Sequence, residues 1–204
     1  MTAKAIKVFL VEDQAMVLGA LVALLEREKD IDVVGRATTA EDALGLLAEI
    51  DVDVLLTDIE LPGESGLDLA EKVHAASPEV RIVMLTTFGR AGYFERAMSA
   101  GASAYILKDS PASELAAAIR KVHAGGRIID PELVAASWAS PNPLTDRERQ
   151  CLKLAGEGLS NSDIAEKVFL SEGTVRNYLS SALAKLNAGN RTEAARLATQ
   201  NGWI

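Results

Sequence analysis

The segment Val54-Leu55-Leu56-Thr57-Asp58-Ile59-Glu60-Leu61-Pro62-Gly63 indicates the architecture of the chain. Its apolar run is typical of a buried strand, and that strand ends on the carboxylate of Asp58. Pro62 and Gly63 then force a turn. Asp58 is therefore expected where a parallel strand ends, at the sheet edge where open α/β proteins bind ligands. A single carboxylate there could also cap a helix or belong to a turn.

Other predicted strands also end on polar side chains. These are the carboxylates Glu12 and Asp13 after residues 6–11, the hydroxyl of Thr86 after residues 80–85, and the ammonium of Lys108 after residues 103–107. Carboxylates brought together repel one another, and a hard cation such as Mg²⁺ relieves that repulsion. A nucleophilic carboxylate, a metal, a hydroxyl donor and a cation are what an aspartyl phosphate requires.

At these strand ends, Glu12, Asp13, Asp58, Thr86 and Lys108 resemble the receiver domain of two-component response regulators. The C-terminal third resembles the LuxR-type helix-turn-helix, and the whole chain resembles the NarL/FixJ family. Glu12 stands where many receivers carry a second Asp. Four segments are most similar to family members that regulate fatty-acid desaturase expression: Thr86-Thr87-Phe88, Gly92-Tyr93-Phe94, Lys108-Asp109-Ser110-Pro111 and Gly173-Thr174-Val175-Arg176-Asn177-Tyr178.

The resemblance implies that Asp58 accepts a phosphoryl group from a sensor histidine kinase. It also implies that Thr86 and Lys108 contact the phosphoryl oxygens, and that Tyr105 changes rotamer on activation. For Tyr105 the alternative is an ordinary half-buried tyrosine of the sheet. The implied ligands of Mg²⁺ are the side chains of Glu12, Asp13 and Asp58 and the backbone carbonyl of Glu60.

The order of predicted elements indicates two domains. Five strand–helix units predict a flavodoxin-like, doubly wound parallel sheet of five strands over residues 1–125. Residues 126–142, rich in proline and serine, are expected to be a linker. Trp138 is a large apolar residue for a free linker, so we expect it to dock against one of the two domains. Residues 143–204 are expected to form a small all-α domain. Ser110 is expected to cap the last receiver helix, with Pro111 in its first position.

Composition limits the cellular setting. Cys151 is the single cysteine of the 204 residues, so no disulfide within the chain is possible, and its apolar helix face predicts a buried thiol. There is no long apolar run and no signal-peptide pattern, which predicts a soluble cytoplasmic protein. The net charge is −8, yet residues 143–204 hold eight cationic and seven acidic side chains. This near-neutral domain predicts modest DNA affinity unless the protein dimerises.

The second domain begins with a capping box formed by Thr145 and Glu148. Helices are expected over residues 146–157, 160–168, 171–186 and 191–200, the third being the recognition helix. The family resemblance implies that Arg176 and Asn177 reach bases, since Arg can read guanine and Asn adenine. Further expected DNA contacts, for which solvated surface residues are the alternative, are Thr174, Ser180, Ser160, Lys185 and Arg191.

Two receiver helices suggest a surface for a homodimer. The first is apolar from Met16 to Leu25 at every position except Gly19, so either a second molecule covers it or small alanines form its outer face. The last helix has an apolar stripe and small neighbours. The residues expected at the dimer surface are Leu18, Leu21, Val22, Leu25, Leu115, Ala118, Ile119 and Val122.

Three classes of function compete. A phosphorylation-switched regulator, which dimerises and binds double-stranded DNA with two half-sites, accounts for both domains. A phosphatase of the haloacid dehalogenase type needs an Asp two residues after the nucleophile, and Glu60 stands there instead. A constitutive DNA-binding regulator would be expected to carry a damaged acidic site, whereas this one is intact. The sequence therefore favours the switched regulator over an enzyme.

Overall fold

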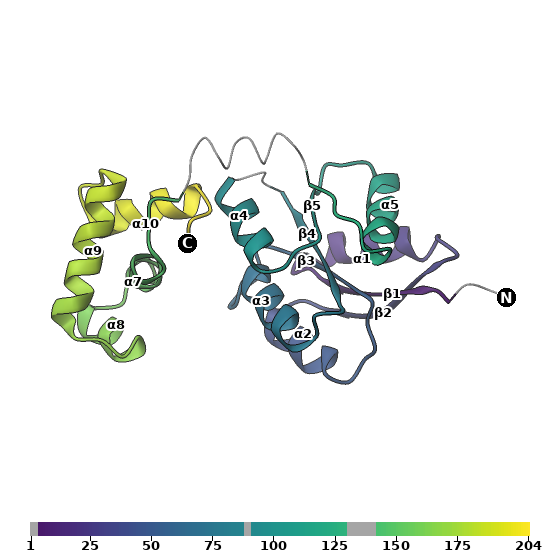
Figure 1. The fold of residues 1–204 in the computed structure, drawn as a ribbon, viewed down its shortest axis with the longest axis horizontal. Coiled ribbons are helices and arrows are strands. Elements are labelled where there is room, and N and C mark those ends of the chain that lie inside the picture. The colour runs from purple at the N-terminus through teal and green to yellow at the C-terminus, as the bar shows by residue number, and fades with distance from the viewer. Residues whose placement is uncertain (1–3, 88–90, 130–141) are drawn as a thin grey trace. The chain divides into compact units, whose positions relative to one another are not determined.

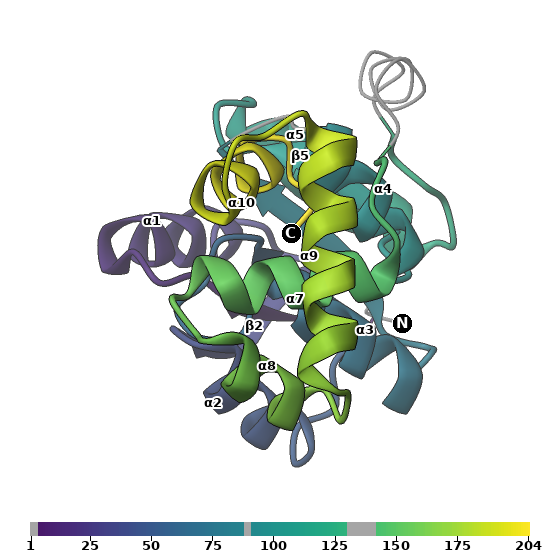
Figure 2. The ribbon, with the colours of Figure 1, turned by 90° about the vertical axis from the view of Figure 1, so that its left-hand side faces the viewer.

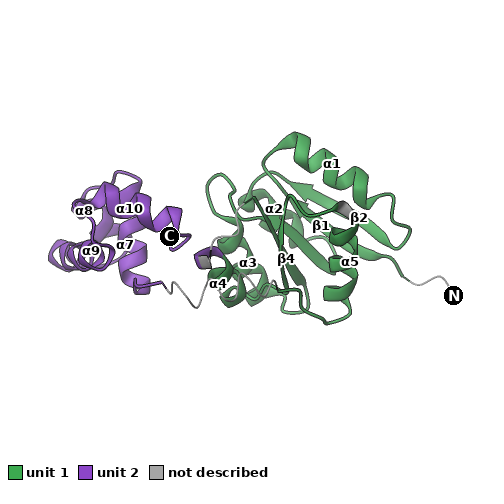
Figure 3. Cartoon of the chain, turned by 90° about the horizontal axis from the view of Figure 1, so that it is seen from above, with its two compact units in different colours: residues 1–89, 94–134 green, residues 90–93, 135–204 purple. Residues whose placement is uncertain are grey.

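The computed structural model describes residues 4–87, 91–129 and 142–204. The chain divides into two compact units, residues 1–89 with 94–134 and residues 90–93 with 135–204 (Figure 3). Most of the expected linker, including Trp138, lies outside the described residues, so its conformation stays a prediction. Among the described helices, none is long and apolar enough to cross a membrane.

The first unit is built on one parallel sheet of five strands in the order β2-β1-β3-β4-β5, which confirms the predicted fold (Figure 1). The strands are β1 (Ile6–Val11), β2 (Ile31–Ala37), β3 (Val54–Asp58), β4 (Arg81–Thr86) and β5 (Ala104–Leu107). Every residue of β3 is buried because helices cover both faces of the sheet, which explains its continuous apolar run. The strand order reverses beside β1 and β3, the place where such sheets bind ligands.

Five helices connect these strands: α1 (Ala15–Leu25), α2 (Ala40–Leu47), α3 (Gly66–Ala76), α4 (Ala91–Ser99) and α5 (Ala112–His123). The expected capping of α5 by Ser110 is wrong. Pro111, with φ −55° and ψ 139°, occupies the N-cap position without a side-chain hydrogen bond. Its extended ψ delays the helix to Ala112, one residue later than expected.

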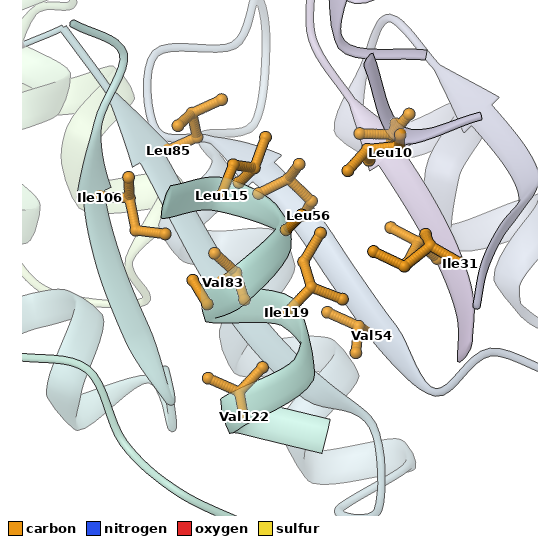
Figure 4. Close-up of a cluster of buried hydrophobic side chains, with 14 of the residues drawn as sticks. Leu10, Ile31, Val54, Leu56, Val83, Leu85, Ile106, Leu115, Ile119 and Val122 are labelled. Atoms are coloured by element: carbon orange, nitrogen blue, oxygen red, sulfur yellow. The ribbon is translucent and has the colours of Figure 1, made fainter. Parts of the chain in front are cut away.

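Helices α1 and α5 cover the same face of the sheet. Figure 4 shows Leu115, Ile119 and Val122 of α5 lying over strand residues such as Leu56 and Val83. Leu18 and Leu25 of α1 join this same cluster of buried side chains. The apolar stripe of α5 is therefore the inner face of a helix packed on its own sheet.

This packing corrects most of the expected dimer surface. Six of its eight residues are at most 8 % exposed and belong to the core, namely Leu18, Leu25, Leu115, Ala118, Ile119 and Val122. A second copy cannot contact side chains that the chain itself covers, so the expectation is wrong for these six. Leu21 and Val22 are half-buried against the core, and their part in a dimer stays a prediction. The side chain of Met16 is 88 % exposed.

The second unit contains four helices within its described residues (Figure 2). They are α7 (Asp146–Gly156), α8 (Asn161–Lys167), α9 (Glu172–Leu186) and α10 (Arg191–Gln200). Val175 and Leu179 of α9 are buried and Leu183 and Leu186 partly so, as their helical spacing predicts. Cys151 lies in the same core, where burial raises the pKa of its thiol.

Glu148 joins the first and third helices of this unit. The predicted capping box is present, with the Thr145 N–H donating to Glu148 Oε2 over 2.7 Å. The same carboxylate, only 3 % exposed, also accepts from Ser181 Oγ and, over 2.6 Å, from Lys185 Nζ of α9. Burial raises the pKa of Glu148, but the hydrogen bonds from Lys185, Ser181 and Thr145 outweigh it and lower the pKa to about 2.

Replacing the carboxylate of Glu148 should lower the stability of the second unit. We expect Glu148→Gln to lower the unfolding free energy by about 1–3 kcal/mol at pH 7, because it weakens charge-assisted bonds at a buried site. The contribution of Glu148 is complete above the ordinary glutamate pKa of 4.5 and is lost as the pH falls towards about 2. The difference between the two proteins should therefore shrink below pH 4.5.

Urea unfolding followed by tryptophan fluorescence measures this difference, since Trp203 packs against the core of this unit. Glu157→Gln, at the exposed end of α7, is the matched control and should behave like the unaltered chain. Equal stabilities of the Glu148→Gln and Glu157→Gln variants at pH 7 would contradict the assignment.

Candidate functional site

The carboxylates predicted at the strand ends lie together. Strands β1 and β3 pair with Val11 opposite Thr57, so Glu12 and Asp58 follow on neighbouring strands. One ligand oxygen from each of Glu12, Asp13 and Asp58 lies within 4.8 Å of the others. Glu12 and Asp58 are buried, whereas Asp13 is exposed and leaves the cluster open to solvent. The predicted acidic cluster is therefore present.

Lys108 neutralises part of this charge. Its Nζ lies 2.7 Å from Glu12 Oε2 and 2.8 Å from Asp58 Oδ2. The Lys108 N–H donates to the Thr86 carbonyl, which continues the pairing of β4 with β5 and brings both residues to the same edge. Burial lowers the pKa of Lys108, but the two carboxylates outweigh it and hold the pKa above its usual value. The side chain is therefore a fixed cation.

Glu12 shows that a further cation fits here. Its Oε1 accepts the Gln14 N–H over 3.2 Å. Its Oε2 is buried and, although close to Lys108, has no hydrogen bond of acceptable geometry within the described structure. Burial raises the pKa of Glu12 in spite of Lys108. A buried carboxylate oxygen that has only the ammonium of Lys108 beside it among the described residues, together with two other carboxylates, forms a donor set suited to a hard divalent ion.

The main chain around Asp58 is held tightly. The Ile59 N–H donates to Asp58 Oδ1 over 2.7 Å, and Thr57 Oγ1 donates to the Asp58 carbonyl. Gly66, the first residue of α3, packs so closely that a Cβ there would lie 1.7 Å from the Asp58 carbonyl oxygen. Only glycine fits at this position, and its contact fixes the strand end that carries the carboxylate.

Thr86, Tyr105 and Glu60 occupy different surroundings. Thr86 is buried at the end of β4. Tyr105 is only 3 % exposed, more deeply buried than the half-buried tyrosine of the alternative, and its ring meets Phe94 of α4 edge to face, with centroids 5.9 Å apart. Its change of rotamer stays a prediction. Glu60 is exposed in the loop after β3, and the role of its carbonyl as a metal ligand also stays a prediction.

The residues expected to contact DNA fall into two groups. Arg176, Asn177 and Ser180 are exposed on α9. The other four have polar contacts within the chain: Thr174 with Ser171 Oγ, Ser160 with Asp163, Lys185 with Glu148, and Arg191 with the Leu159 carbonyl. The Lys185 contact was not foreseen, because the sequence shows Glu148 only as a capping residue. Phe169, 94 % exposed between α8 and α9, was also not foreseen.

Removing Lys108 should expose the repulsion between the carboxylates. We expect Lys108→Met to lower the unfolding free energy by about 3 kcal/mol in metal-free buffer, because it leaves buried charges uncompensated. Asp58→Asn in the same chain should restore part of the loss, giving a non-additive double-mutant cycle. Urea unfolding measures both effects, with Lys121→Met on the exposed side of α5 as the control. Additive losses would contradict the proposed coupling.

Comparison with known proteins agrees with this geometry. Residues 8–120 match the response regulator receiver domain, and residues 142–198 match the luxR family of bacterial regulatory proteins. The transcriptional regulatory proteins YvfU and DesR of Bacillus subtilis are 48 % and 46 % identical to the chain; each alignment covers 98 % of it and 100 % and 99 % of those relatives.

A solved structure is similar over the same length. The response regulator ChrA of a heme-sensing two-component system is 33 % identical, with a TM-score of 0.56 over 99 % of this chain and 100 % of that one. The chain therefore belongs to the NarL/LuxR family of two-component response regulators, transcriptional regulators that join a receiver to a LuxR-type DNA-binding domain.

Proposed function

We propose that phosphorylation of Asp58 by a sensor histidine kinase switches this regulator on. The observation that carries the proposal is the position of Asp58 Oδ2, 2.8 Å from the cation of Lys108 and beside two other carboxylates. A carboxylate oxygen of Asp58 attacks the phosphorus of the kinase phosphohistidine. A P–O bond forms, the P–N bond breaks, and the imidazole of the kinase leaves.

Glu12, Asp13, Asp58 and the carbonyl of Glu60 would hold Mg²⁺. When bound, Mg²⁺ supplies positive charge that stabilises the phosphoryl oxygens during transfer. Lys108 would also stabilise the phosphoryl oxygens, because its ammonium already lies between the carboxylates of Glu12 and Asp58. The Thr86 hydroxyl is the proposed second donor. Both groups would bind the phosphoryl oxygens once the carboxylate of Asp58 is modified.

The switch then follows from the change in charge. Phosphorylation replaces the −1 carboxylate of Asp58 by a phosphoryl group of roughly −1.5 to −2 charges that projects further from the strand, which draws Lys108 and Thr86 towards it. Thr86 ends the strand beside Tyr105, whose ring packs on Phe94 of α4. A shift of Thr86 would change the room available to Tyr105 and thereby bias the receiver towards a conformation that dimerises.

Beryllofluoride, a mimic of the phosphoryl group, tests the switch. We expect Mg²⁺ with beryllofluoride to convert the protein from monomer to dimer, because the mimic occupies the site that Lys108 and Thr86 close upon. The measurement is molar mass by light scattering after gel filtration, with Mg²⁺ alone as the reference. Asp58→Ala should abolish the change. An unchanged mass, together with equal DNA binding in both states, would instead favour a constitutive regulator.

The second unit would read DNA through α9. Arg176 and Asn177 are the proposed base contacts, joined by Ser180, all exposed on this helix. Thr174, Ser160, Lys185 and Arg191 are the proposed further contacts with bases or phosphates. Because this unit has little excess positive charge, binding would depend on two recognition helices about 34–36 Å apart on a two-half-site operator.

Substitution of a base-reading arginine should change sequence preference. We expect Arg176→Ala to weaken binding by about 1–3 kcal/mol and to relax discrimination at one base pair of each half-site. The DNA is obtained by in-vitro selection with the beryllofluoride-activated protein, and affinity is measured by fluorescence anisotropy. Arg196→Ala, exposed on α10, controls for loss of charge. An unchanged preference with uniformly weaker binding would make Arg176 a phosphate contact instead.

The segments similar to the desaturase regulators support a finer proposal, that the target genes include membrane-lipid genes of the desaturase type. DesR, at 46 % identity, is one of the relatives found. Mapping the selected DNA sequences onto the genome of the source organism tests the proposal. Selected sites that lie away from lipid genes would remove it without affecting the switch.

A further inference from the structure

The loop between β3 and α3 has one firmly held end and one projecting tip. The Gly66 N–H donates to the Ile59 carbonyl over 3.0 Å, which closes the loop at its base beside Asp58. Residues 60–65 lie beyond this closure. The tip contains Glu60, whose carbonyl the proposed function assigns to the cation. The Leu61 N–H also donates to the Ile59 carbonyl over 3.2 Å, so this side of the tip is tied to the base, whereas these two bonds leave the chain from residue 62 to residue 65 to be held by other contacts.

Two side chains from outside the tip hold it. Glu41, in the first turn of α2, accepts the Glu64 N–H at Oε1 over 3.2 Å. Lys72 of α3 binds the Glu64 carboxylate, with Nζ 2.6 Å from Oε1. Glu64 is thereby fixed by its backbone to α2 and by its side chain to α3.

The Glu41 carboxylate also packs closely against the backbone of the loop. Gly63 has φ +77°, and a Cβ added there would lie 2.7 Å from Glu41 Oε1. The carboxylate therefore lies against the glycine of the turn, where a larger residue would displace it.

An ordinary role for Glu41 at the start of a helix does not account for this placement. The N-terminus of α2 is already capped by Thr39, whose Oγ1 accepts the Asp42 N–H. Asp42, the next residue, supplies the same charge in the same turn. Glu41 differs from it by its contact with the loop.

We propose that Glu41 is a positioning residue for the cation and phosphoryl site, acting through the backbone of the β3–α3 loop. The inference rests on the proposed function, because it concerns the site at which that function places Mg²⁺. By accepting the Glu64 N–H, Glu41 limits the movement of the tip and so keeps the Glu60 carbonyl at a constant distance from Asp58. Residues that orient a metal site from outside its ligand set typically affect metal affinity.

Calorimetric titration of the full chain with Mg²⁺ alone tests the inference. We expect Glu41→Ala to weaken Mg²⁺ binding about tenfold with an unchanged urea midpoint, since the residue is exposed. Glu41→Gln keeps an oxygen that can accept the hydrogen bond and should remain within about threefold of the unaltered chain. Asp42→Ala is the matched control for charge and should bind Mg²⁺ normally.

A second variant tests the route through the loop. Gly63→Ala should displace the Glu41 carboxylate, so Glu41→Ala should cause little further loss of Mg²⁺ affinity in that background. Normal binding by Glu41→Ala would overturn the inference. Equal losses in Glu41→Ala, Glu41→Gln and Asp42→Ala would also overturn it, because they would show a general effect of charge. If the unaltered chain binds no Mg²⁺, or Asp13→Asn does not weaken it, the proposed site itself fails.

Discussion

The receiver depends on a buried excess of negative charge that the chain neutralises only in part. Glu12 and Asp58 are buried at neighbouring strand ends, and the single ammonium of Lys108 lies within 2.8 Å of both. Asp13 adds a third carboxylate at the solvent side, and the buried Glu12 Oε2 lies beside Lys108 without a hydrogen bond of good geometry in the described structure. Such a cluster is costly to bury unless a cation or a modified carboxylate completes it. The same imbalance supports the proposal that the site binds Mg²⁺ and accepts a phosphoryl group.

The main chain at Asp58 is held by direct backbone packing, whereas the loop that follows it is held in part by side chains. Gly66 packs directly on the backbone of Asp58, so the residue that we propose as the phosphoryl acceptor is fixed by α3 as well as by its own strand. The loop tip beyond it is held by side chains, among them Glu41. Such contacts can weaken one at a time without unfolding the sheet, which is consistent with the proposal that this site accepts and releases a phosphoryl group.

In the second unit, the buried carboxylate of Glu148 holds one face of α9, and the opposite face of this helix is exposed. Glu148 accepts hydrogen bonds from Ser181 and Lys185, one turn apart on α9, and from its own capping partner Thr145. These bonds set the rotation of α9 and leave Arg176 and Asn177 on the exposed side. They also engage one of the few cations of a near-neutral domain, so a single copy has little charge with which to bind DNA.

Local sequence patterns are sufficient to predict the five-stranded sheet, the meeting of Glu12, Asp13, Asp58 and Lys108, and the capping box of Thr145. These features follow from periodicity, from the shared edge of parallel strand ends and from neighbours along the chain. Three features became evident only from the packing of the elements: the stripe of α5 faces its own core, Lys185 binds Glu148, and Glu41 accepts a hydrogen bond from the loop after β3. An apolar stripe on a helix has the same sequence pattern whether a sheet or a second molecule covers it. The identity of a charged residue likewise does not indicate which residue it pairs with. The physical reason is that contacts between distant segments depend on how the elements pack, which local pattern does not encode.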